Sequence, residues 1–194
     1  AMQDLPVIGG LEDPEPLSPY FRLRETVRAA NPALVAALGY LEIWQWLGFG
    51  ATIIAATLAT GLVVAVMRAA GRTATRLAGL HGLAFPTGLL VAAVIVNWSV
   101  VRLGMTQAGI PLIGALSGVF LVVALAYFAY RFVTLLGGWM YDTAKKTTSY
   151  VDEIATSLGT GLAKLLIVVG AIIAIADVVG LPYEGVITGL GVGG

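Results

Sequence analysis

The chain alternates long, uncharged apolar stretches with shorter segments that carry its charges. Four stretches are rich in Ala, Val, Leu and Ile, and each is long enough as an α-helix to cross a hydrocarbon core about 30 Å thick. These predicted transmembrane helices cover residues 49–67, 84–101, 112–130 and 162–179. A fifth apolar segment begins near Tyr183. Because the sequence lacks the ten-residue alternation of a transmembrane β-barrel, we predict an all-α integral membrane protein.

The overall composition agrees with this class. Hydrophobic residues make up 58% of the chain and charged residues only 11%, whereas about a quarter of the residues in a typical soluble domain are charged. The mean hydropathy is +0.91. A net charge of zero argues against a nucleic-acid partner. The sequence contains no cysteine, which excludes disulfides and thiolate metal sites.

The placement of Lys and Arg predicts the orientation of the helices. Seven basic residues belong to one side of the membrane: Arg68, Arg72, Arg76, Arg131, Lys145, Lys146 and Lys164. The other side has Arg102 and three N-terminal arginines, Arg22, Arg24 and Arg28. Two of these three count less, because the positive-inside rule weighs mainly residues within about 15–20 positions of a span. We therefore predict a bacterial inner-membrane protein with its N-terminus in the periplasm, and with the fifth helix running inward.

The segment ahead of the spans divides into two parts. Residues 1–31 are rich in proline and acidic residues near the start, which predicts an extended segment. Asn31-Pro32 is typical of a helix start, and we predict an interfacial helix over residues 32–48; a simple N-terminal extension of the first span is the alternative. Three aromatic residues in this part are predicted membrane-interface anchors: Tyr40, Trp44 and Trp46.

Few polar residues interrupt the apolar segments, and none forms a recognisable catalytic or metal-binding set. Asp177 lies near the end of the fourth span and belongs either to an ion path, a proton relay or a helix contact, or to the outer headgroup level. Asn97 is expected to hydrogen-bond to a neighbouring helix, and Glu42 and Gln45 to lie at the water interface. His81 is expected to be a surface residue of a basic loop. We expect no enzyme activity, no cofactor and no metal site.

The segment that begins at Tyr183 is dense in glycine. Gly185, Gly189 and Gly193 follow one another at every fourth position, and five of the last ten residues are glycine. Each glycine costs a helix about 1 kcal/mol relative to alanine, but such a stripe lets another helix approach closely in lipid. Weaker small-residue patterns occur in the third span, at Gly114 and Gly118, and in the first span. The terminal run therefore predicts close packing of several copies around an axis.

The run from Val179 to Gly194, with its Gly189-Leu190-Gly191-Val192-Gly193-Gly194 pattern, resembles the start of the pore helix of MscS-type small-conductance mechanosensitive channels. The resemblance is specific over residues 150–194, and residues 1–149 match only as additional outer helices. It implies a ring of seven copies, with small ions as permeants and membrane lipids as partners. It also implies two sets of site residues: packing glycines at Gly185, Gly189, Gly191, Gly193 and Gly194, and a pore entrance at Tyr183 and Glu184.

Two classes of function follow from this reasoning. In the first, residues 49–182 form the outer, tension-sensing helices and residues 183–194 begin a pore-lining helix that we expect to continue beyond Gly194. The protein is then a subunit of a tension-gated channel that acts as an osmotic safety valve. In the second, the chain is a small multipass transporter or a non-conducting scaffold subunit. A transporter usually shows internal repeats or paired broken helices, and no convincing repeat is present in the sequence.

Overall fold

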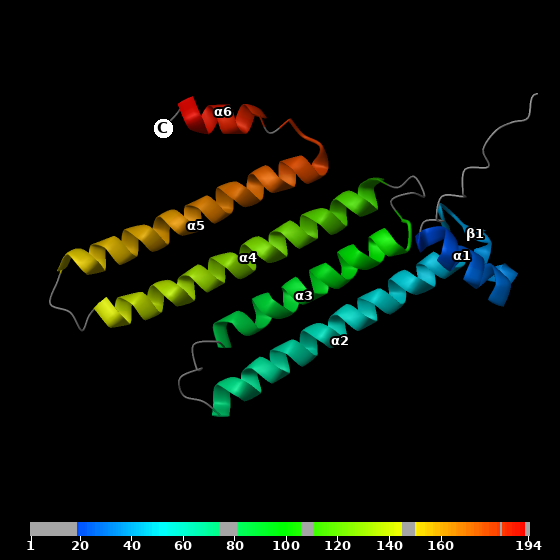
Figure 1. Cartoon of the computed structure of the whole chain (residues 1–194), viewed down its shortest axis with the longest axis horizontal. Coiled ribbons are helices and arrows are strands. Elements are labelled where there is room, and N and C mark those ends of the chain that lie inside the picture. The colour runs from blue at the N-terminus through cyan, green and yellow to red at the C-terminus, as the bar shows by residue number, and fades with distance from the viewer. Residues whose placement is uncertain (1–18, 74–80, 106–110, 145–149, 183, 193–194) are drawn as a thin grey trace, which may run out of the picture.

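Four long helices dominate the computed structural model, which describes residues 19–73, 81–105, 111–144, 150–182 and 184–192 (Figure 1). They are α2 (Ile43–Thr73), α3 (His81–Arg102), α4 (Pro111–Ala144) and α5 (Tyr150–Val179). All four are long and apolar enough to cross a membrane. The predicted class, an all-helical, membrane-embedded protein with four complete spans, is confirmed at this level.

The helices are longer than the spans that the sequence predicts. Helix α4 has 34 residues, which at about 1.5 Å per residue is some 51 Å and exceeds a hydrocarbon core of roughly 30 Å. Helix α5 begins at Tyr150 instead of residue 162. The residues added to both helices lie toward the α4–α5 connection. No proline lies among them, so the backbone continues as a helix past the level of the first charged side chains.

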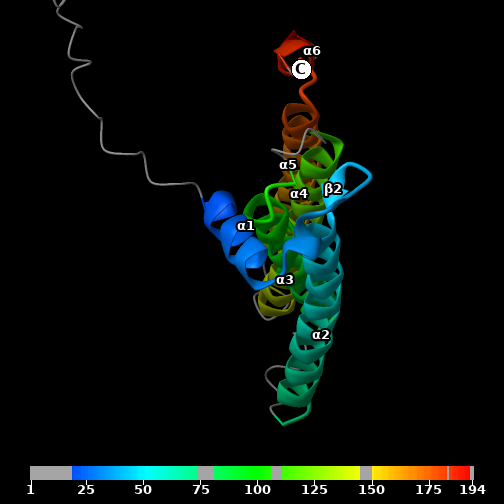
Figure 2. The same cartoon turned by 90° about the vertical axis from the view of Figure 1, so that its right-hand side faces the viewer.

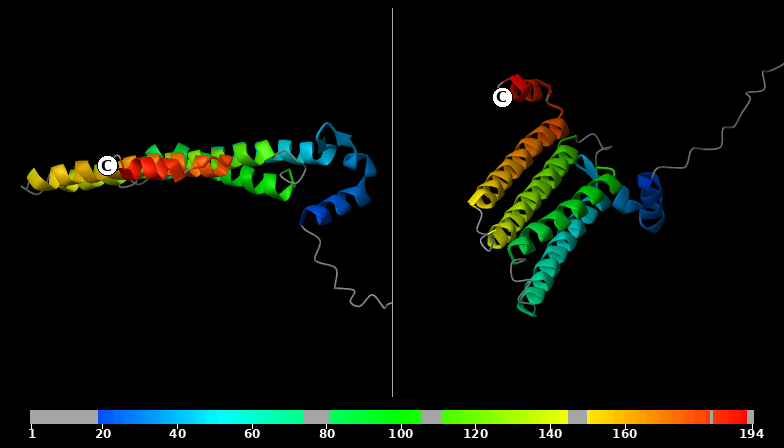
Figure 3. Two further views of the ribbon diagram at one scale, coloured as in Figure 1. Left: turned by 90° about the horizontal axis from the view of Figure 1, so that it is seen from above. Right: turned by 60° about the vertical axis from the view of Figure 1, so that its left-hand side comes forward.

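The four helices lie side by side in chain order and form a single layer, which is seen edge-on in Figure 3 (left). The main contacts join α2 to α3, α3 to α4, and α4 to α5. A layer one helix thick leaves apolar side chains exposed on both faces, among them Ile54, Leu58 and Leu158. No residue in the most apolar stretch of α5 is buried within the described chain. Lipid or further protein chains must therefore cover most of this surface.

Glycines let neighbouring helices approach closely within the layer. Four of them touch side chains of a neighbouring helix: Gly71 on His81, Gly88 on Thr60, Gly118 on Val178, and Gly137 on Thr160. A Cβ atom added at Gly88 would lie 2.9 Å from the Thr60 methyl group, and the Thr60 hydroxyl donates a hydrogen bond of 2.9 Å to the Gly88 carbonyl. Small residues and interhelical hydroxyl bonds are the usual means of helix packing in lipid. Gly118 belongs to the predicted GxxxG pattern, whereas Gly88 and Gly137 were not predicted.

The predicted extended segment over residues 1–31 is wrong at its C-terminal end. Residues Pro19–Ala30 form helix α1, which lies beside the layer (Figure 2). After Pro19 at the first helical position, the sequence has no further proline or glycine before Asn31, so nothing interrupts the helix. The proline-rich residues 1–18, for which the extended form was predicted, lie outside the described residues.

The predicted interfacial helix over residues 32–48 is also wrong. Asn31 does cap a helix, since its side chain accepts a hydrogen bond from the Ala33 backbone, but this is a single 3₁₀ turn, η1 (Pro32–Val35). The short strands β1 (Ala37–Leu38) and β2 (Leu41–Glu42) then form an antiparallel hairpin. Gly39 turns it with a φ of 71°, a conformation that glycine adopts readily. Residues 43–48 belong to α2, as in the alternative interpretation.

Candidate functional site

A glycine-containing turn separates α5 from the last described helix, α6 (Glu184–Val192). Gly180 has a φ of 76°, and its N–H donates to the Asp177 carbonyl at 3.0 Å. The Leu181 N–H donates to the Ala176 carbonyl at 2.8 Å. These two bonds form a Schellman motif, which satisfies the last carbonyls of a helix and ends it. Pro182 follows, and the chain turns back from the end of α5 (Figure 1).

Helix α6 carries the glycines that the sequence singles out, and its surface is open. Gly185, Gly189 and Gly191 are exposed, and a Cβ atom added at any of them would meet no other atom within 4 Å. The helix stands apart from the layer and makes no extensive contact with another described helix (Figure 1). Glu184 is exposed in its first turn. The other predicted residues of this site, Tyr183, Gly193 and Gly194, lie outside the described residues.

At the start of α2, Glu42 joins α1 to the membrane helices. Its carboxylate accepts hydrogen bonds from the Arg24 Nε at 2.8 Å and from the Trp44 indole at 2.6 Å. Burial alone would raise the pKa of Glu42, but the hydrogen bonds from Arg24 and Trp44 and the charge of Arg24 outweigh it, so the pKa lies below its ordinary value. The hydrogen bond and the charge of Glu42 in turn raise the pKa of Arg24. Glu42 is thus a charged, partly buried link between α1 and α2.

Gln45 extends this link to the connection between α3 and α4. Its side chain is 1% exposed and accepts from the Glu42 N–H at 2.9 Å. Its amide donates to the Leu103 carbonyl at 2.8 Å. Tyr20 of α1 stacks on Trp44 with ring centres 6.0 Å apart and also packs against Gly104. Helix α1 is therefore docked on the beginning of α2 and on the end of α3.

The aromatic residues predicted as membrane anchors occupy different surroundings. Tyr40 is 87% exposed at the tip of the hairpin. Trp46 is about half exposed, and its indole donates to the Leu38 carbonyl at 3.1 Å. Trp44 is buried, so its position among Tyr20 and Glu42 is that of an internal packing residue. A place at the membrane interface therefore remains a prediction for Tyr40 and Trp46 alone.

The remaining polar residues of the spans do not converge on one site. Asn97 is half-buried and makes no side-chain hydrogen bond to the described residues, so its predicted bond to a neighbouring helix is not formed within this part of the chain. Asp177 is exposed in the last turn of α5. The Lys164 ammonium lies 5.1 Å from the centre of the Tyr130 ring. His81 begins α3 instead of lying in a loop. Over the described ranges, no group of three acidic or histidine residues could hold a metal ion.

No family model, curated protein or solved structure matches this chain. Two parts of the described structure are distinctive: a layer of membrane helices one helix thick and, at its edge, a glycine-rich helix that makes no extensive contact with another described helix.

Proposed function

We propose that this protein is a subunit of a membrane-tension-gated ion channel, an osmotic safety valve in which α6 begins the pore-lining helix. The observation that carries the proposal is the open glycine surface of α6, at Gly185, Gly189 and Gly191. Glycine in a helix lowers its stability, and in lipid the compensation is close packing against another helix. Because the described part of this chain supplies no such helix, we infer that other copies supply it, in a ring of seven as the resemblance implies.

The single layer of α2–α5 supports the second requirement, which is coupling to the bilayer. Membrane tension favours whichever state of a protein occupies the larger area in the membrane plane, so it shifts an existing equilibrium between closed and open states. A thin layer with both faces apolar presents a large lipid-facing perimeter. It is joined to α6 only through the turn at Gly180 and Pro182, so a tilt of the layer would be transmitted directly to the start of α6.

The distribution of charge supports the proposed orientation. Arg68 and Arg131 lie in the halves of α2 and α4 that end at the α2–α3 and α4–α5 connections, and Lys164 lies at the middle of α5. Helix α1 and the hairpin lie at the other end of the layer (Figure 1). The positive-inside rule favours a cytoplasmic location for the end of the layer that carries the α2–α3 and α4–α5 connections. Helix α6 then runs inward from the periplasmic side of a bacterial inner membrane. Small ions are the proposed permeants.

Recording from reconstituted membranes tests this function. The native protein is incorporated into liposomes, and excised patches are held under increasing suction. We expect channel openings that begin at a defined suction and are absent from protein-free patches of the same lipid. If inserted protein gives no current up to the suction at which the patch ruptures, the channel proposal fails, and a scaffold or transporter role takes its place.

A further inference from the structure

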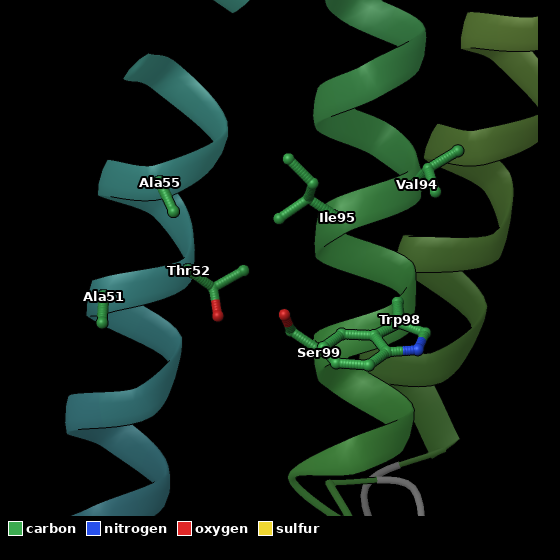
Figure 4. Close-up of a pocket in the computed structure, with 7 residues that line it drawn as sticks. All are labelled: Ala51, Thr52, Ala55, Val94, Ile95, Trp98 and Ser99. Carbon is green, nitrogen blue, oxygen red and sulfur yellow. The ribbon is translucent and has the colours of Figure 1, made fainter. Parts of the chain in front are cut away.

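A groove of about 480 Å³ runs between α2 and α3 on one face of the helix layer (Figure 4). Helix α2 lines it with Ala51, Thr52 and Ala55, and α3 contributes Trp98 and Ser99 among others. The two alanines leave the space open, while the large indole of Trp98 forms part of the opposite wall. Ala51 and Ala55 belong to the small-residue pattern of the first span and lie one helical turn apart on α2 (Figure 4).

A positively charged side chain lies at one end of this groove. Arg102, the last residue of α3, places its guanidinium 4.8 Å from the centre of the Trp98 ring. Arg102 is exposed and forms no ion pair with a carboxylate in the described ranges, where Arg24 and Glu42 make the ion pair. The end of a membrane-spanning helix lies near the lipid headgroups. From Arg102 back to Val94 the groove follows α3 for about 12 Å at roughly 1.5 Å per residue.

The groove walls offer few hydrogen-bonding partners to a water molecule. Thr52 already donates its hydroxyl proton to the Gly48 carbonyl at 2.8 Å, and a buried water needs about two to four polar partners. The Ser99 hydroxyl makes no hydrogen bond to another described residue. The Ser99 hydroxyl can therefore donate a hydrogen bond to an ester carbonyl of a lipid. Since the groove opens on a face of a layer of membrane helices, hydrocarbon is the natural filling for its apolar length.

We propose that the α2–α3 groove binds one anionic phospholipid, with the phosphate on Arg102 and an acyl chain against Trp98, Ala51 and Ala55. Guanidinium groups bind phosphate through paired, charge-assisted hydrogen bonds, and the anionic headgroup complements the charge of Arg102, which has no carboxylate partner in the described part of the chain. This proposal does not depend on channel activity, because retention of a lipid can be measured without any current.

Native mass spectrometry of the whole protein tests the headgroup contact. The protein is reconstituted with dioleoyl phosphatidylglycerol or dioleoyl phosphatidylcholine, whose acyl chains are identical, and is then released into detergent. We expect wild-type protein to retain phosphatidylglycerol in preference to phosphatidylcholine. Arg102→Gln removes a charge-assisted hydrogen bond and should lower that retention about tenfold. Arg28→Gln removes the same charge from an exposed position of α1 that does not line the groove, and should change nothing.

A second pair of variants tests the groove itself. Ala55→Leu fills it without altering charge and should reduce retention to the level of Arg102→Gln, whereas Ala65→Leu adds the same volume to an exposed part of α2 and should not. Excess inorganic phosphate should leave the bound lipid in place, because the acyl chain contributes to binding. The proposal is overturned if Arg102→Gln or Ala55→Leu retains as much phosphatidylglycerol as wild type, or if phosphate alone displaces the lipid.

Discussion

The carboxylate of Glu42 has lost most of its contact with water, with a side chain 16% exposed, yet it faces two donors at hydrogen-bond distance. A buried carboxylate is costly unless it is paired and hydrogen-bonded. Arg24 and Trp44 meet both conditions, and they belong to different elements. The tie between α1 and the membrane helices is therefore electrostatic as well as apolar, and it depends on Glu42 remaining ionised.

The first prediction concerns the pH dependence of this tie. Because the pKa of Glu42 in the folded protein lies below its ordinary value of 4.5, its contribution to stability is complete above that value and is lost as the pH falls through the folded pKa. Glu42→Gln should lower the free energy of unfolding by about 1 kcal/mol at pH 7. Thermal unfolding in detergent measures the difference, which should shrink as the pH falls below 4.5 and disappear once the pH is below the folded pKa of Glu42. A difference that stays constant with pH would contradict an ionised Glu42.

The second prediction concerns the close contact at Gly88. A valine there would place its Cβ atom 2.9 Å from the Thr60 methyl and 3.2 Å from the Thr60 carbonyl oxygen. Part of this contact is backbone, so the helices must separate, and such overpacking costs about 1–3 kcal/mol. Gly159→Val is the matched control, because an added Cβ at Gly159 meets no atom within 4 Å. Equal melting temperatures for the two variants in detergent would show that the α2–α3 contact is not close-packed.

At the scale of elements, Gly180 fixes the junction between α5 and α6. Its left-handed conformation costs a non-glycine residue about 1–2 kcal/mol, less for asparagine. We predict that Gly180→Ala lowers the stability by about 1 kcal/mol, and that Gly180→Asn lowers it by less. Chemical unfolding in mixed micelles compares the two variants. Since the space around Gly180 is open, a larger loss with asparagine would show that volume matters at this position and backbone conformation does not.

The elements differ in how far the sequence predicts them. The four spans were predictable because an uncharged stretch of about 20 residues has few alternatives to a membrane helix. The ends of the helices were not predictable from hydropathy, because a helix can continue beyond the point at which its residues stop being apolar. The docking of α1 against the hairpin depends on Arg24 and Glu42, which are 18 positions apart in sequence, so no local pattern reveals this contact. The sequence did contain one indication that Glu42 has a special role, since Glu42 is the only acidic residue between Glu25 and Asp142.

The candidate site, like the helices, was predicted from the sequence only in part. The glycines of α6 were found by their spacing alone. Trp44 was assigned to the membrane interface because tryptophan is common there, but stacking with Tyr20 and a bond to Glu42 bury it. The groove beside Trp98 could not be predicted, because it arises only when α2 and α3 pack side by side.

For the whole molecule, the single layer leads to a prediction about assembly. Four helices in one plane leave most of the apolar surface of α5 uncovered within the described chain, and α6 adds an open glycine face. We predict that the native protein is a ring of seven copies in mild detergent, with α5 and α6 toward the centre and α2 at the rim. Native mass spectrometry counts the copies directly, and a monomer as the main species would contradict a ring.

The most direct test of the central claim is a comparison of two valine variants under membrane tension. Gly189→Val fills the open face of α6, whereas Gly61→Val adds the same side chain to an open position on α2. Both are recorded in excised patches of liposomes that contain the native protein or one variant. If copies of α6 pack and slide against one another, Gly189→Val will require more suction to open than wild type, and Gly61→Val will not. An unchanged opening threshold for Gly189→Val would contradict the account.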